Sequence, residues 1–144
     1  MSYYADSSFL VSCYLPDANT SKAKSYLRSI GAPLVLNALQ ALEVGNAFEL
    51  GVFRGLFSAT DAASARANLV QDLRTGRLVK TAVHWPLAMR VASALSKRHS
   101  ATAGTRSLDI LHVAAAKSLR AAEFISFDSR QRLLATALGL KVAP

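Results

Sequence analysis

Residues 107–116 read SLDILHVAAA, an apolar stretch whose third residue is Asp109. The stretch predicts a helix, and the small residues after the acid would let this helix pack closely on a sheet. Asp109 is then expected to face inward, although carboxylates avoid protein interiors unless their charge is compensated. A divalent cation held by oxygen ligands is one compensation. A place in the first turn of a helix, where the helix dipole favours an acid, is the simpler one.

Three further acids lie in apolar segments. Asp6 follows a predicted strand at 3–5, Asp128 follows a predicted strand at 124–127, and Glu43 lies on the apolar stripe of a predicted helix. The chain has nine acidic and seventeen basic residues, so four acids in its most hydrophobic segments are conspicuous. Together these positions raise the hypothesis of a metal-dependent site.

Short apolar runs alternate with longer helical patterns, without a repeat, a linker or a low-complexity tract. Strands are predicted over residues 3–5, 34–36, 78–83, 124–127 and 140–142. Helices are predicted over residues 7–15, 20–29, 37–57, 60–76, 85–99, 107–122 and 129–138, with Asn37 and either Thr60 or Asp61 as caps and residues 100–107 as a loop. This alternation predicts an α/β fold with a parallel sheet covered on both faces, in a single domain over residues 1–144.

Each acid also has a structural interpretation. Asp6 and Asp128 stand where an N-cap would begin the next helix, but the carboxyl ends of neighbouring parallel strands share one edge of a sheet, where sites form. Glu43 would equally fit a buried ion pair with an Arg or a Lys. His112 is interpreted as a structural hydrogen-bonding residue, since an all-carboxylate site suits Mg²⁺ or Mn²⁺ better than one with histidine.

The charge balance favours a polyanionic partner. The formal net charge is +8 and the isoelectric point is about 10.2, although solubility or an acidic protein partner would also account for these values. An enzyme that cuts a phosphodiester needs cations for the backbone as well as carboxylates for a metal. Arg106 and Arg130 flank two of the acids and are the first candidates for nucleic-acid contacts, followed by Lys97, Arg98 and His99.

The cellular compartment is predicted from the cysteine content and from the absence of a signal-peptide or transmembrane pattern. The single Cys13 cannot form an internal disulfide, and the first residues show no basic region followed by an apolar one. No apolar stretch approaches the length of a transmembrane helix. These features predict a protein of the reducing cytoplasm, without a signal peptide or a membrane segment.

The predicted helix 37–57 is apolar on more than one side, with one row formed by Val44, Phe48, Val52 and Leu56. A helix that is apolar on two sides is usually central in its fold. The excess of Leu, Ala and Val also indicates a hydrophobic surface for a protein partner. The sequence supports both interpretations of this helix.

The four acidic segments, in this order and in these contexts, resemble the PIN-domain ribonuclease family, and in particular its VapC-type toxins. The matching segments read YADSS at 4–8, LE at 42–43, RSLDILHVAAA at 106–116 and ISFD at 125–128. The third and fourth segments, at their separation near the C-terminus, carry most of the specificity. The resemblance covers essentially the whole chain.

The resemblance implies a three-layer α/β/α sandwich with a central parallel sheet of about five strands. It also implies an endoribonuclease that uses Mg²⁺ or Mn²⁺ and acts as the toxin of a toxin–antitoxin pair, on a tRNA, an rRNA or an mRNA. A small antitoxin would inhibit it, and a homodimer or a toxin–antitoxin hetero-oligomer is expected. The implied metal ligands and catalytic residues are Asp6, Glu43, Asp109 and Asp128, supported by Ser7, Ser8 and Ser126.

Three other functions are open from the sequence. A stand-alone RNA-processing nuclease of the same family would keep the fold and the site without an antitoxin. A receiver-like phosphoryl-transfer domain would use Asp6 as nucleophile and leave Glu43 and Asp109 unexplained. A noncatalytic RNA-binding module would explain the basic charge but not the carboxylates on apolar faces.

Overall fold

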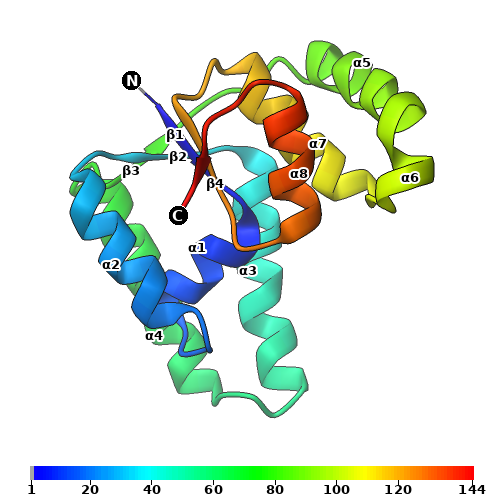
Figure 1. Ribbon diagram of the computed structural model, residues 1–144. Helices are drawn as coiled ribbons and strands as arrows, with labels where there is room; N and C mark the ends of the chain where they lie inside the picture. Colours follow the sequence, from blue (N-terminus) through cyan, green and yellow to red (C-terminus); the bar gives the residue numbers. More distant parts are fainter. Residues whose placement is uncertain (1) are drawn as a thin grey trace. The chain divides into compact units, whose positions relative to one another are not determined.

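The computed structural model describes residues 2–144, which form two compact units. The first unit runs to Asp6 and resumes over residues 82–144, and the second contains residues 7–81. Figure 1 labels the helices and strands of both. That the whole chain is a single domain stays a prediction. Within residues 2–144, no helix combines the length with the hydropathy that a membrane crossing requires.

Five short strands form a parallel sheet in the order β3-β2-β1-β4-β5. They are β1 (Tyr3–Ala5), β2 (Leu34–Leu36), β3 (Leu78–Lys80), β4 (Glu123–Ile125) and β5 (Val142–Ala143). All residues of β2 and β4 are buried, as expected for a parallel sheet with helices on both faces. The predicted α/β/α sandwich is therefore confirmed.

The first unit contains β1, β4, β5 and the helices that follow Ala82. These helices are α5 (Trp85–Leu95), the π-helix η1 (Ser96–Ser100), α6 (Ala101–Ala103), α7 (Ser107–Ser118) and α8 (Ser129–Ala137). Ala5 lies opposite Ile125 in the pairing of β1 with β4, and the backbone N–H of Asp6 donates to the carbonyl oxygen of Ile125 over 2.9 Å. Backbone pairing thus continues to the first acid and determines where its side chain starts.

Helix α7 is buried along most of its length. Every residue from Asp109 to Ala116 is buried, and the small residues at its centre allow the close packing that the sequence predicts. The hydroxyl of Tyr4 on β1 and Nδ1 of His112 on α7 are hydrogen-bonded over 2.8 Å. His112 therefore has the structural role predicted for it, and the bond ties α7 to the strand that ends before Asp6.

The second unit contains β2, β3, α1 (Ser7–Tyr14), α2 (Thr20–Ile30), α3 (Ala38–Phe53) and α4 (Ala59–Arg74). Asn37 caps α3 as predicted, because its side chain accepts from the N–H of Gln40 over 3.0 Å while the Gln40 side chain accepts from the N–H of Asn37. Helices α3 and α4 pack against each other. Each of these two long helices begins at its own capping residue.

The cap predicted for α4 is wrong. Ser58 caps this helix, whereas Thr60 and Asp61 lie inside it. The hydroxyl of Ser58 accepts from the N–H of Asp61 over 3.0 Å, and the Asp61 carboxylate accepts from the N–H of Ser58 over 2.9 Å. This reciprocal pair satisfies two N–H groups at the helix start, which is why the helix begins earlier.

The apolar row on α3 belongs to the core for part of its length. Val44 and Phe48 are at most 1% exposed. The helix ends at Phe53 instead of residue 57, because the chain turns at Gly55, whose φ is +68°. Leu56 lies beyond this turn and is exposed. The row is therefore buried in the core at Val44 and Phe48 and exposed to solvent at Leu56.

The loop predicted over residues 100–107 is also wrong. Helical structure continues through η1 and α6 to Ala103, and residues 104–106 are the whole connection to α7. Gly104 ends this helical run with φ of +63°, a conformation that glycine adopts without strain. The error concerns Ser100, the last residue of η1, and the short helix α6, because the segment from Ser100 is polar and contains Gly104 and therefore resembles a loop.

Other boundaries shift by a few residues, as helix and strand ends commonly do. β3 ends at Lys80, α7 ends at Ser118, and β5 covers Val142–Ala143 instead of residues 140–142. β4 ends at Ile125, because the parallel pairing with β1 and β5 ends there. Ser126 and Phe127 therefore follow the strand instead of ending it.

Replacing Tyr4 with phenylalanine keeps the ring and removes the hydroxyl that meets His112. We expect Tyr4→Phe to lower the free energy of unfolding by roughly 1–3 kcal/mol, because the buried ring nitrogen loses this partner. Chemical denaturation measures the change, and a double-mutant cycle with His112→Phe isolates the pair. A coupling energy near zero in that cycle would contradict the role assigned to this hydrogen bond.

Candidate active site

Asp6 is the most buried of the acids that the sequence singles out in the first unit. It is 1% exposed and directly follows β1. Its Oδ2 accepts a hydrogen bond from the hydroxyl of Ser126 over 2.5 Å. Ser126 directly follows β4, so residues just past two paired strands meet at one edge of the sheet.

Asp128 is joined to the same hydroxyl. Its backbone N–H donates to the Oγ of Ser126 over 3.0 Å. Its side chain caps α8, because Oδ1 accepts from the N–H groups of Arg130 and Gln131, each over 2.9 Å. Asp128 therefore is an N-cap, as its structural interpretation predicts, and it stands two residues from the partner of Asp6.

Gln131 links Asp128 to Asp109. Its side-chain Nε2 donates to Oδ1 of Asp109 over 3.1 Å, and the residue is 6% exposed. A carboxylate only accepts hydrogen bonds, so the amide must present its nitrogen to Asp109. Its Oε1 is buried, and within residues 2–144 it has no hydrogen-bond partner. Such an orphaned buried oxygen is uncommon in a folded protein.

These contacts form a continuous series that we call the acid network: Asp6, Ser126, Asp128, Gln131 and Asp109. All five residues belong to the first unit, where α7 packs against α8. The network brings three of the four predicted acids into one hydrogen-bonded arrangement. Ser126 and Gln131 are its neutral connecting residues.

Asp109 has a second set of partners. Its Oδ2 lies 3.2 Å from Nε of Arg106 and 3.4 Å from the backbone N–H of that residue. The Arg106 side chain is 76% exposed, so this ion pair is partly screened by solvent. The carboxylate also lies in the first turn of α7, where the helix dipole favours it. The structural interpretation of Asp109, an acid in the first turn of a helix, therefore applies, and the ion pair with Arg106 adds to it.

The donor set fits a hard divalent cation, because carboxylate and amide oxygens are the ligands that Mg²⁺ and Mn²⁺ prefer. Within residues 2–144, no three side chains of the His, Cys, Asp and Glu types form a preassembled metal cluster. Mg²⁺ keeps several waters and is commonly held by one or two carboxylates, so such a cluster is not required. The orphaned Oε1 of Gln131 supports the fit, since it is a buried oxygen beside Asp109 that lacks a partner.

The remaining predicted residues lie outside the acid network. Glu43 is partly buried on α3, and Ser7 and Ser8 begin α1, all in the second unit, so their roles stay predictions. Lys97 and Arg98 are exposed on η1.

Arg130 is exposed at the start of α8, and its guanidinium donates to the carbonyl oxygen of Gly104 over 3.5 Å. Gly104 stands two residues before Arg106. Arg130 therefore reaches toward the segment that begins α7.

Gln131 is the residue that the sequence prediction missed. A glutamine in a polar helix has no distinctive pattern of its own. One signal was present, because an N-cap at Asp128 puts residue 131 at the third helical position, whose side chain turns back toward the cap. That rule places Gln131 beside Asp128 but says nothing about Asp109.

Substitutions of Asp128 separate its capping role from its charge. We expect Asp128→Ala to lower the free energy of unfolding by roughly 1 kcal/mol, because α8 loses its cap. Asp128→Ser keeps a capping oxygen, so its stability should lie within a few tenths of a kcal/mol of the unaltered protein. Thermal and chemical denaturation compare the three proteins. Equal stability of the alanine and serine variants would contradict the capping role.

No curated relative matches the chain. The chain is similar to a solved structure described as the crystal structure of FitAcB from Neisseria gonorrhoeae, with a TM-score of 0.63 and 15% identity over 100% of this chain and 97% of that chain. At that identity the likeness shows the fold alone. The family model described as the PIN domain matches residues 3–137, which is nearly the full length. The chain therefore belongs to the PIN domain family.

Proposed function

We propose that the protein is a metal-dependent endoribonuclease that acts as the toxin of a VapC-type toxin–antitoxin pair. PIN domains are typically nucleases, and membership of the family supports hydrolysis of RNA. The observation that carries the proposal is the acid network, which holds Asp6, Asp109 and Asp128 together at one edge of the sheet. Carboxylates gathered in this way can hold a divalent cation, and cleavage of a phosphodiester is commonly assisted by one.

In this proposal Asp6 and Asp109 hold Mg²⁺ or Mn²⁺, and Asp128 and Glu43 act through water or a second ion. When bound, the metal neutralises charge on the phosphate and makes a bound water more acidic. Ser126 keeps the Asp6 carboxylate in one orientation by donating to Oδ2. Gln131 does the same for Asp109 by donating to Oδ1. Both donors are neutral, so they orient the carboxylates without competing for them as a second cation would.

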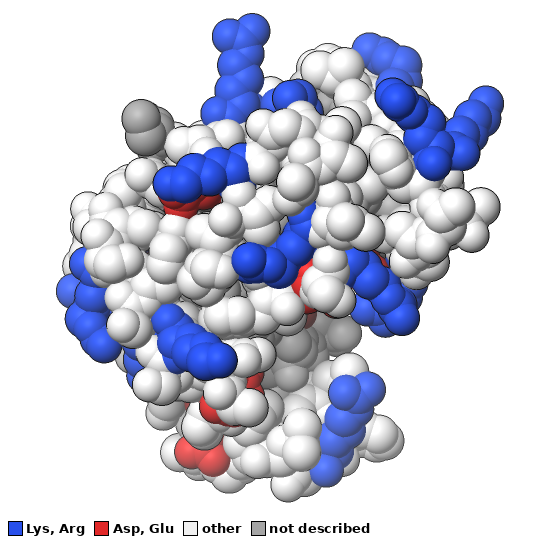
Figure 2. Space-filling model, in the orientation of Figure 1, with Lys and Arg blue, Asp and Glu red and all other residues white. Residues whose placement is uncertain are grey.

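The basic surface supports binding of the RNA backbone. Figure 2 shows Lys and Arg side chains at many places on the visible face, with few Asp and Glu side chains among them. Arg106 lies against Asp109 with most of its side chain exposed, which suits a contact to a phosphate near the metal. Arg130, bonded to Gly104, is the second candidate. Lys97 and Arg98 on η1 would extend the contact along the RNA backbone.

A small antitoxin is the proposed protein partner. Large apolar side chains at the far part of α3 and after it are exposed, and Phe53 reaches 87%. Leu42 and Leu56 are exposed as well. Exposed apolar groups of this size favour a protein contact. The proposal places the pair in the cytoplasm, as a toxin–antitoxin hetero-oligomer or with a homodimeric toxin.

A stand-alone RNA-processing nuclease of the same family is the second candidate, since it shares the acid network and differs only in its partner. A small gene next to the one that encodes this chain, whose product inhibits cleavage, would decide for the toxin. A receiver-like domain is disfavoured by the burial of Asp6, because a nucleophile that is 1% exposed gives a phosphodonor little access.

Cleavage of RNA by the purified protein is the direct test. With total tRNA and ribosomal RNA as substrates, we expect cleavage in Mg²⁺ or Mn²⁺ and none in EDTA. Asp109→Asn keeps the size of the side chain and removes its charge, so cleavage should fall by about a hundredfold or more. Gel analysis of the fragments over time measures the rates.

The same assay includes Asp128→Ser as a variant with its cap intact. RNA cleavage by this variant should be slower although its helix cap is kept, because the carboxylate is absent. Full activity of Asp109→Asn, or cleavage that continues in EDTA, would overturn the proposed mechanism. A contaminating nuclease is excluded by purifying each variant in parallel.

Gln131 is a positioning residue in this proposal, and Gln131→Leu tests it. The change removes the donor to Asp109, so cleavage and Mn²⁺ affinity should each fall about 10- to 100-fold. Because it also removes an orphaned buried oxygen, the free energy of unfolding should change by no more than ~1 kcal/mol. Gln71→Leu, on the exposed part of α4, is the matched control.

A second substitution of Gln131 tests the effect of a negative charge beside Asp109. Gln131→Glu puts a second carboxylate beside Asp109, and their repulsion should move the acidic limb of the pH–rate profile to higher pH. A purely structural role would lower stability without moving that limb. Unchanged Mn²⁺ affinity in Gln131→Leu, measured by electron paramagnetic resonance, would refute the positioning role.

A further inference from the structure

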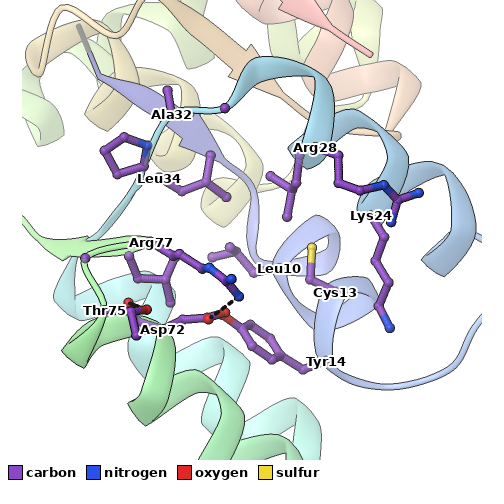
Figure 3. Close-up of a pocket in the computed structure, with 15 residues that line it drawn as sticks. Leu10, Cys13, Tyr14, Lys24, Arg28, Ala32, Leu34, Asp72, Thr75 and Arg77 are labelled. Atoms are coloured by element: carbon purple, nitrogen blue, oxygen red, sulfur yellow. Dashed lines mark hydrogen bonds and ion pairs between the residues drawn. The ribbon is translucent and has the colours of Figure 1, made fainter.

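The second unit contains a cavity of about 590 Å³. It lies among α1, α2, the end of α4 and the strands β2 and β3, as Figure 3 shows. None of the four predicted acids lines it. Its volume is within the range of sites that hold small organic molecules.

Part of the wall is apolar. Leu10, Leu27, Leu34 and Leu78 line the cavity, together with Pro33. Leu10, Leu34 and Leu78 are buried, so this wall is continuous with the core of the unit. It would receive the hydrocarbon or aromatic part of a ligand.

The acid in the wall already has its partners. Asp72 accepts from the hydroxyl of Tyr14 over 2.8 Å through Oδ2 and from the guanidinium of Arg77 over 3.5 Å through Oδ1. Figure 3 shows the Arg77–Asp72 pair as a dashed line. Burial, and then the bond to Asp72, raise the pKa of Tyr14, so its hydroxyl stays protonated and keeps donating. The negative charge of Asp72 is therefore compensated within the wall.

Two cations in the wall are not compensated. Lys24 and Arg28 stand four residues apart on α2, so they project from the same side of the helix. Among residues 2–144, neither forms an ion pair with an acid, and both are exposed. Figure 3 shows both side chains on the α2 side of the cavity. The wall thus presents an excess of positive charge beside an apolar surface.

Cys13 also lines the cavity, and its thiol does not alter the charge of the wall. Burial raises its pKa to about 12, an effect that nearby Lys24 only partly opposes, so the group is neutral at physiological pH. A neutral thiol neither repels an anion nor attacks it. The thiol therefore adds no charge to the wall.

We propose that this cavity binds a small amphipathic anion, whose apolar body packs on the leucine wall and whose carboxylate or phosphate group meets Lys24 and Arg28. The excess of positive charge in the wall favours an anion over a cation. The site is independent of the acid network, so it stands whether or not the protein cleaves RNA.

The test uses three ligands with the same ten-carbon chain, each below its micelle concentration: decanoate, decyl phosphate and decyltrimethylammonium. We expect both anions to bind and the cation to bind at least about tenfold more weakly, because its head group carries the charge that Lys24 and Arg28 repel. The ratio of affinity for decyl phosphate and decanoate tells which head group the site prefers. Titration calorimetry gives the affinities, and amide shifts in α1 and α2 locate the site.

The variant Lys24→Gln/Arg28→Gln should weaken binding of both anions about tenfold, because it removes the uncompensated charge. Lys22→Gln/Arg74→Gln makes the same change in net charge at exposed positions outside the cavity wall, and it should leave binding within about twofold. All four positions are exposed, so both variants are expected to fold.

Three results would overturn the proposal. Equal binding of the cationic ligand would mean that charge has no part in recognition. Equal weakening in both double variants would mean that net charge, not this cavity, attracts the anions. Binding of a glutamate-rich peptide that decanoate does not displace would assign the surface to a protein partner instead.

Discussion

The hydrogen bond from the Ser126 hydroxyl to the carboxylate of Asp6 is the contact on which the arrangement of the acids depends. Asp6 leaves the end of β1 with almost no solvent around it, and a buried charge costs free energy unless hydrogen bonds or an opposite charge compensate it. The same hydroxyl accepts from the backbone of Asp128, so one side chain joins the residues that follow two paired strands. The rest of the acid network extends from this point through Gln131 to Asp109.

The structural and the functional interpretations of these acids do not compete. Asp128 caps α8 with Oδ1, and Asp109 closes the first turn of α7 with Oδ2 while Gln131 binds its Oδ1. Caps and helix dipoles hold a carboxylate in its charged form and in a fixed direction. A metal-binding acid needs both properties, so the local devices that begin the two helices also prepare the proposed ligands.

The basic residues divide between two proposed uses. Arg106 pairs with Asp109 at the acid network, whereas Lys24 and Arg28 stand at a cavity that holds none of the four acids. A net charge of +8 alone would have suggested a single polyanion-binding surface. Ion pairing distinguishes the two proposed uses, because Arg106 is paired with an acid, whereas Lys24 and Arg28 on α2 are not.

Local patterns in the sequence determined the alternation of strands and helices, the cap at Asn37 and the choice of Asp6, Asp109 and Asp128, because apolar periodicity and capping depend on neighbouring residues. The same patterns failed at Ser100 and α6, where a polar segment with Gly104 resembles a loop. Only the tertiary structure joined Ser126 to Asp6, 120 positions away, and Gln131 to Asp109, 22 positions away. Contacts at such separations follow from strand pairing and from the packing of α7 on α8, which no local pattern encodes. The cavity of the second unit arose in the same way, from three helices whose sequences reveal only that each has an apolar side.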